Sequence, residues 1–83
     1  MELKDFFKQS QRIIETKDKK DYGNAEMATK IGVTEQTYGK YKRGEINPLI
    51  ATAILNLLSN MDNENIVQMI RDWEKESRKK KIQ

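Results

Sequence analysis

Residues 27–48 read MATKIGVTEQTYGKYKRGEINP and decide the fold, because they contain two short helical segments joined at a glycine. Glycine enters the left-handed backbone conformation without the steric cost of a side chain, so Gly32 can reverse the chain directly after a first helix. Thr34 is a good N-cap for a second helix that begins at Glu35. Ala28 is small enough to let the two helices approach closely. The stretch therefore predicts a compact pair of helices joined by a sharp turn.

The rest of the chain reads as helical in both directions from this stretch, since period-two alternation is absent. In the segment before it, Leu3, Phe7, Ser10 and Ile14 share an apolar face with Phe6 and Ile13 beside it, while Gln11 and Glu15 fall outside that face. After it comes the most apolar segment of the chain, which we expect to be the central packing element. Five helices are predicted, at residues 2–16, 25–31 with Asn24 as N-cap, 35–42, 48–59 and about 63–78 with a basic tail at Arg78, Lys79, Lys80 and Lys81.

Length and composition favour one small all-α domain, residues 1–83, that binds a partner and is not an enzyme. The chain has no cysteine and no histidine, which removes thiol nucleophiles, imidazole bases and the usual zinc ligands, so we expect no catalytic residue, no metal, no cofactor and no small-molecule ligand. The charged N-terminus and the lack of an apolar run of about 20 residues predict a cytoplasmic protein without a membrane span. A net charge of +3 permits nucleic-acid binding.

The segment resembles the helix-turn-helix of the Cro and C1 phage-repressor family, also called the XRE family. The likeness covers residues 24–59 and includes the apolar helix that follows the motif. The residues that match the family at its spacings are Ala28, Gly32, Val33, Thr34, Gly44 and Pro48. The resemblance implies a five-helix, lambda repressor-like fold with its helix-turn-helix at about residues 24–43. It also implies a transcriptional regulator, a repressor or autoregulator that binds an inverted-repeat operator in double-stranded DNA as a dimer.

The second helix of the motif is the expected recognition helix. Its helical phase turns Tyr38 and Tyr41 inward, whereas Gln36 and Lys40 lie four residues apart on the opposite side. Glutamine can pair with adenine and lysine with guanine O6 and N7. By the resemblance, the base-contacting positions are Glu35, Gln36, Thr37 and Lys40, and the phosphate-contacting positions are Asn24, Thr34, Lys42 and Arg43.

Two residues of this helix leave alternatives open. Glu35 is repelled by phosphate unless it accepts a hydrogen bond from cytosine N4, and it is equally explained as an acid that the helix dipole favours in the first turn. Gly39 weakens the helix interior by about 0.8–1 kcal/mol relative to alanine. It either lets the helix lie close to DNA or lets it lie close to the preceding helix.

Specific binding by such a motif usually needs two copies, with recognition helices about 34 Å apart. The last helix carries Ile66, Ile70 and Trp73 on one stripe, which we predict to form the homodimer interface; the alternative is that the stripe completes the core. Two other functions compete with the regulator. The chain could be an antitoxin or another module that binds a protein partner, or a structural adapter whose DNA-reading face is degenerate.

Overall fold

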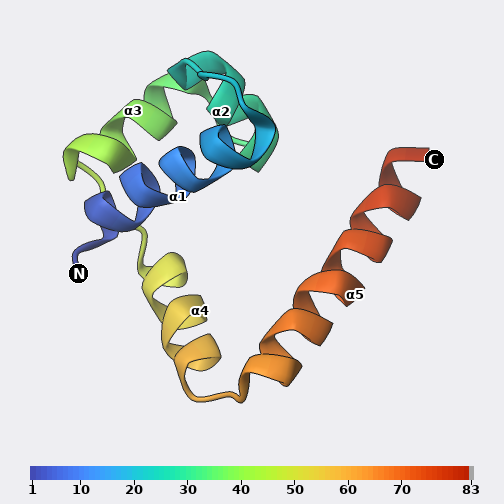
Figure 1. The fold of residues 1–83 in the computed structure, drawn as a ribbon. Coiled ribbons are helices and arrows are strands. Elements are labelled where there is room, and N and C mark those ends of the chain that lie inside the picture. The colour runs from blue at the N-terminus through green and yellow to red at the C-terminus, as the bar shows by residue number, and fades with distance from the viewer. Residues whose placement is uncertain (83) are drawn as a thin grey trace. The chain divides into compact units, whose positions relative to one another are not determined.

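The computed structural model is all-helical over the part of the chain it describes, which is the backbone of residues 1–82 and the side chains of residues 1–77. No strand occurs within those residues, so the predicted all-α class is confirmed. The five helices lie where they were predicted, although α1 and α5 continue beyond their predicted ends (Figure 1). They are α1 (Leu3–Asp18), α2 (Asn24–Ile31), α3 (Glu35–Arg43), α4 (Leu49–Ser59) and α5 (Asn63–Ile82). The chain divides into two compact units, Met1–Leu49 and Ile50–Gln83.

The turn between α2 and α3 has the predicted local structure. Gly32 ends α2 in the left-handed conformation, with φ 83°, and its N–H donates to the Ala28 carbonyl at 2.8 Å. Thr34 caps α3, because its hydroxyl oxygen accepts from the Thr37 N–H at 3.2 Å. Gly44 ends α3 in the same left-handed way, with φ 76°. These caps satisfy backbone groups that the ends of short helices leave without partners, so α2 and α3 have sharply defined ends.

The N-cap of α2 was predicted wrongly. Asn24 is the first residue of the helix, and the N-cap is Gly23, whose N–H donates to the Glu26 carboxylate at 3.4 Å. Glu26 reaches back over one turn to the cap, which is the acidic half of a capping box. The Asn24 side chain is therefore not used for capping and is available for tertiary contacts.

The core of the first unit consists of Met27, Ala28 and Tyr38, each almost completely buried. Phe7 of α1 packs on this core, with its ring at right angles to Tyr38 and stacked on Tyr41 at a centroid separation of 4.9 Å. The inward phase of both tyrosines is thus confirmed. Ile14, Tyr22 and Val33 also pack against this core and are half-buried.

Ile13 does not belong to the core, although the sequence placed it beside the apolar face of α1; it is 68% exposed. The side of α1 that α3 covers is narrower than the apolar stripe, so a residue at the edge of the stripe stays in solvent.

In the second unit, α4 has no buried residue, which contradicts its predicted role as the central packing element. Ile50, Ile54 and Leu57 are all exposed. Apolar side chains occur around most of α4, and the described part of α5 makes too few contacts with α4 to cover them. Apart from Ala51 at the start of α4, the half-buried apolar side chains described in this unit lie near the α4–α5 turn in sequence; they are Leu55, Leu58, Met61 and Ile66. Within the described residues, no helix is both long and apolar enough to cross a membrane.

Candidate functional site

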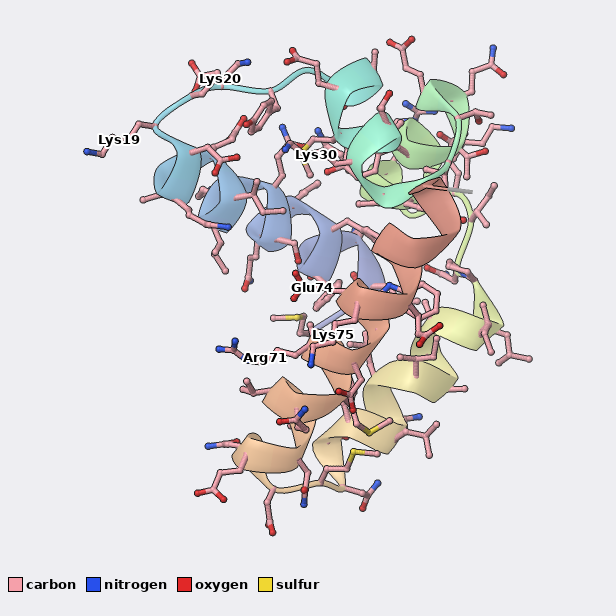
Figure 2. The ribbon with its side chains drawn as sticks, turned by 90° about the vertical axis from the view of Figure 1, so that its right-hand side faces the viewer. Lys19, Lys20, Lys30, Arg71, Glu74 and Lys75 are labelled. Carbon is pink, nitrogen blue, oxygen red and sulfur yellow. The ribbon has the colours of Figure 1, made fainter. Side chains whose placement is uncertain are left out.

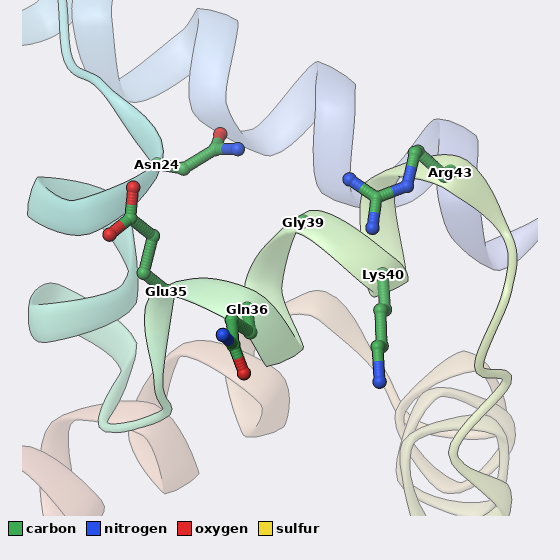
Figure 3. A pocket seen from close by; sticks show the side chains of 6 residues that line it. All are labelled: Asn24, Glu35, Gln36, Gly39, Lys40 and Arg43. Atoms are coloured by element: carbon green, nitrogen blue, oxygen red, sulfur yellow. The ribbon is translucent and has the colours of Figure 1, made fainter.

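The outward face of α3 carries the exposed polar residues that the sequence predicted. Glu35, Gln36, Lys40 and Arg43 are all exposed, whereas Tyr38 on the opposite face is 1% exposed. Gln36, Lys40 and Arg43 follow one another at steps of four and three residues, so they form one stripe along the helix. Figure 3 shows Gln36 and Lys40 projecting from the same side of α3. The packing of Tyr38 therefore fixes which side chains α3 presents to solvent.

An open recess lies along this face and brings together most of the predicted site residues. It is lined by Asn24 of α2 and by Glu35, Gln36, Gly39, Lys40 and Arg43 of α3 (Figure 3). Two of these residues are hydrogen-bond acceptors as well as donors, one is a carboxylate and two are cations. The recess thus offers both donors and acceptors, which is the chemistry needed to read the edge of a base pair.

Gly39 forms a buried part of the recess wall. A Cβ atom at this position would lie 3.0 Å from Nη1 of Arg43 and 3.6 Å from Nδ2 of Asn24. A Cβ here would displace the flexible Arg43 guanidinium slightly and would make an ordinary van der Waals contact with the Asn24 side chain. The approach of α3 to Asn24 therefore does not by itself require glycine, and both explanations of Gly39 remain predictions.

Thr34 and Thr37 lie outside the recess and form a hydrogen-bonded pair at the start of α3. The Thr34 hydroxyl donates to Thr37 Oγ1 at 2.8 Å, and the Thr37 N–H donates back to Thr34 Oγ1 at 3.2 Å. The pair locks the first turn of α3. Thr37, which the sequence assigned to base contact, is half-buried in this arrangement.

Arg43 stands at the exposed end of the stripe. Its Nε donates to the Glu45 carboxylate, and both side chains are more than half exposed. An exposed ion pair of this kind contributes about 0–1 kcal/mol, so its role is to orient the guanidinium more than to stabilise the fold.

Lys42 is turned away from the recess, although the sequence assigned it to phosphate contact with Arg43. Its Nζ donates to Asn24 Oδ1 at 3.0 Å and to Gln11 Oε1 at 3.1 Å, and it lies 5.3 Å from the centre of the Tyr38 ring. Lys42 follows Tyr38 by four residues, and both therefore lie on the inner face of α3. Lys42 connects the end of α3 to α1 and to the start of α2.

Gln11 is the centre of this polar network, and sequence reasoning missed it by placing it on the outer side of α1. Its Oε1 also accepts from the Tyr38 hydroxyl at 2.7 Å, and its Nε2 donates to the Tyr22 carbonyl at 2.9 Å and to the Glu15 carboxylate at 3.3 Å. A signal for this position existed, because Phe7, Gln11 and Ile14 lie at steps of four and three residues on one stripe.

Hydrogen bonds and burial shift the pKa values of the groups around Gln11. The Tyr22 N–H, which donates to Glu15 at 2.9 Å, and the Gln11 amide lower the pKa of the Glu15 carboxyl. Burial, with the nearby charge of Glu15, raises the pKa of the Tyr38 hydroxyl. Near neutral pH, Glu15 is therefore a charged acceptor and Tyr38 a neutral donor, which is what their hydrogen bonds require.

Tyr22 attaches the α1–α2 connection to both helices. Its hydroxyl donates to the Asp18 carboxylate at 2.6 Å, which lowers the pKa of Asp18 and raises that of Tyr22. Lys30 lies 4.8 Å from the centre of the Tyr22 ring and 3.8 Å from Asp18. Lys19 and Lys20 project from the connection (Figure 2).

The predicted dimer residues belong to the second unit. Ile66 is half-buried, Ile70 is 48% exposed and Trp73 is 68% exposed. Arg71 and Lys75 project from the same helix (Figure 2). The side chains of the basic tail, Arg78 to Lys81, lie outside the described residues. Among the side chains that are described, no group of three or more acidic residues is placed to hold a metal ion.

No protein-family model, no curated protein and no solved structure matches this chain.

Proposed function

We propose that the chain is a sequence-specific double-stranded DNA-binding protein of the Cro/C1 (XRE) type, with a lambda repressor-like arrangement of helices. In this proposal α2 and α3 are the helix-turn-helix, and α3 enters the major groove. The observation that carries the proposal is the exposed polar stripe on α3, directly opposite the buried Tyr38. A short helix that is anchored by an aromatic residue and presents such a stripe is suited to reading base edges.

The side chains on the stripe have the chemistry for direct readout. The Gln36 amide can make paired hydrogen bonds to adenine, and Lys40 can donate to guanine O6 and N7. Glu35 can accept from cytosine N4 at the start of the helix, and the Thr37 methyl group can contact a thymine methyl. Base contacts therefore come from the first two turns of α3.

Phosphate contacts come from the ends of the two helices. Arg43 is an exposed cation at the end of α3, Asn24 lies in the first turn of α2, and Thr34 stands at the N-terminus of α3, where backbone N–H groups and the helix dipole favour an anion. These contacts orient α3 in the groove and carry no sequence information of their own.

A single α3 reads only a few base pairs, so the functional form in this proposal is a homodimer on an inverted repeat. The exposed residues of α5, Ile70 and Trp73, are the proposed contact between the two copies. A dimer bound over a promoter acts as a repressor or autoregulator by excluding polymerase.

The test is selection of bound sequences from a random duplex pool, followed by measurement of the affinity for the most enriched sequence. We expect an inverted repeat with half-sites about one helical turn apart. Gln36→Ala and Lys40→Ala should each cost about 1–3 kcal/mol and relax the preference at one position per half-site. Lys75→Ala, which removes an exposed charge from α5, is the matched control and should leave the preference unchanged.

Two outcomes would contradict the proposal. If no sequence is enriched, the polar face of α3 does not read DNA, and a protein partner becomes the better explanation of the fold. If the Lys40 and Lys75 variants lose affinity alike and the Gln36 variant loses none, DNA binding is electrostatic only and the assignment of the reading face is wrong.

A further inference from the structure

Lys42 is the cation of α3 whose surroundings differ most from those of a phosphate ligand. An ammonium group has three donor directions. Here two of them are used by Gln11 Oε1 at 3.1 Å and Asn24 Oδ1 at 3.0 Å, and the group lies 5.3 Å from the centre of the Tyr38 ring. To reach a phosphate, Lys42 would have to give up contacts to both α1 and α2.

The hydrogen bonds of Gln11 are complete in the same way. Its oxygen accepts from Tyr38 and Lys42, and its amide nitrogen donates to the Tyr22 carbonyl and to Glu15. The orientation of this amide is fixed, because the reversed amide would set two N–H donors against the Lys42 ammonium. Gln11 thus holds two residues of α3, four positions apart, at one point on α1.

Lys42 also determines which end of the Asn24 amide faces the recess. Because Oδ1 of Asn24 accepts from Lys42, the donor Nδ2 is directed towards the recess wall, 3.6 Å from where a Cβ of residue 39 would stand. The recess therefore receives an N–H donor whose direction depends on a lysine that is not part of the recess.

We propose that Gln11 and Lys42 are positioning residues that lock α3 onto α1 and orient Asn24, and that Lys42 does not bind phosphate. The proposal rests on the proposed DNA-binding function and corrects one assignment within it. Of the two adjacent cations at the end of α3, the exposed Arg43 contacts the DNA backbone and the half-buried Lys42 holds the helix that does so.

The first experiment compares the salt dependence of binding to the selected operator for the wild type, Lys42→Met and Arg43→Met. Each phosphate contact that is lost lowers the slope of log K against log salt by about 0.9 per protomer. We expect Arg43→Met to lower the slope by this amount and Lys42→Met to weaken binding with the slope unchanged. Equal losses of slope in the two variants would show that Lys42 binds phosphate and would overturn the proposal. Lys42→Gln takes the place of the methionine variant if that variant does not fold.

The second experiment needs no DNA. A double-mutant cycle with Gln11→Leu and Lys42→Met measures the coupling of the two residues in the unfolding equilibrium, by urea denaturation. Residues in one hydrogen-bond network are expected to couple by at least about twofold in the unfolding constant. Gln68→Leu replaces Gln11→Leu in the control cycle, because the hydrogen bond of Gln68 among the described side chains lies within α5, to Asp72 at 2.9 Å.

The two experiments separate the two proposals. Coupling between Gln11 and Lys42 without enrichment of any DNA sequence would remove the proposed function and leave the lock on α3 in place. If the changes in unfolding free energy are additive in the Gln11–Lys42 cycle, with no greater coupling than in the control, the proposal that Gln11 and Lys42 hold α3 on α1 is wrong, whatever the protein binds.

Discussion

Lys19 ends α1 in a conformation that an L-residue adopts at a cost. Its φ is 55° and its ψ is 47°, and it is the one residue other than glycine with positive φ among the described residues. The left-handed conformation costs an L-residue about 1–2 kcal/mol, and glycine avoids this cost. Glycine loses about 0.5–1 kcal/mol through the greater freedom of the unfolded chain. The difference, about 0–1.5 kcal/mol, predicts that Lys19→Gly stabilises the protein by about 0.75 kcal/mol at its centre, or about 3–6 °C in Tm.

The measurement is thermal and urea unfolding of Lys19→Gly beside Lys20→Gly. Both variants remove one lysine and add one glycine, so net charge and unfolded-state entropy change equally, whereas only position 19 has positive φ. Lys20→Gly also removes exposed contacts of Lys20 with Glu26, at 4.0 Å, and with the Tyr22 ring, at 5.4 Å from its centre, which add to its destabilisation. Lys20→Gly should therefore destabilise by about 0.5–1 kcal/mol. If the two variants lower the stability equally, the cost assigned to the Lys19 backbone does not exist.

Two further predictions concern pH and self-association. The pKa values of Glu15 and Asp18 are lowered by hydrogen bonds from the backbone and hydroxyl of Tyr22, so the stabilisation they give is present above their ordinary values of 4.5 and 3.8 and is lost as the pH falls through the lower, folded values. The urea concentration at the unfolding midpoint, measured from pH 7 to pH 2, should decrease once the pH is below about 4. The decrease should be smaller in Glu15→Gln, and an equal decrease in that variant would mean that other carboxylates cause the loss of stability. Trp73→Ala should weaken the dimer by about tenfold or more in sedimentation equilibrium, since buried aromatic anchors carry most interface energy. Ile13→Ala, a residue of α1 with the same 68% exposure, should leave association unchanged, and a Trp73 variant that associates like the wild type would exclude α5 as the contact.

The parts of the fold that could be predicted from sequence are those governed by local rules. Gly32 and Gly44 end their helices, and Thr34 begins one, because the energies that decide these positions come from neighbouring backbone groups. The inward phase of Tyr38 and the tight position of Ala28 follow from helical periodicity in a short motif. Local rules thus determine the turn and the face of α3 that is exposed.

The parts that could not be predicted depend on which surfaces meet. The apolar composition of α4 indicates a tendency to be buried but does not indicate which surface packs against it. In the structure none of its residues is buried. Asn24 has the chemistry of an N-cap, yet Gly23 takes that position because Glu26 reaches back to it. Met27 is 1% exposed, although a methionine at the start of a motif gives no sign of that.

Lys42 shows how resemblance and geometry can disagree about one residue. Resemblance assigns Lys42 and Arg43 together, because a motif is matched by position along the chain. Adjacent residues on a helix point about 100° apart, so two neighbours at its end seldom face the same surface. Lys42 follows the buried Tyr38 by four residues, and Arg43 follows Lys40 by three, which places one cation against α1 and the other on the exposed stripe. In the proposed complex, the cations of α3 that contact DNA are then Lys40 and Arg43, and Lys42 contributes to affinity only by holding the helix in position.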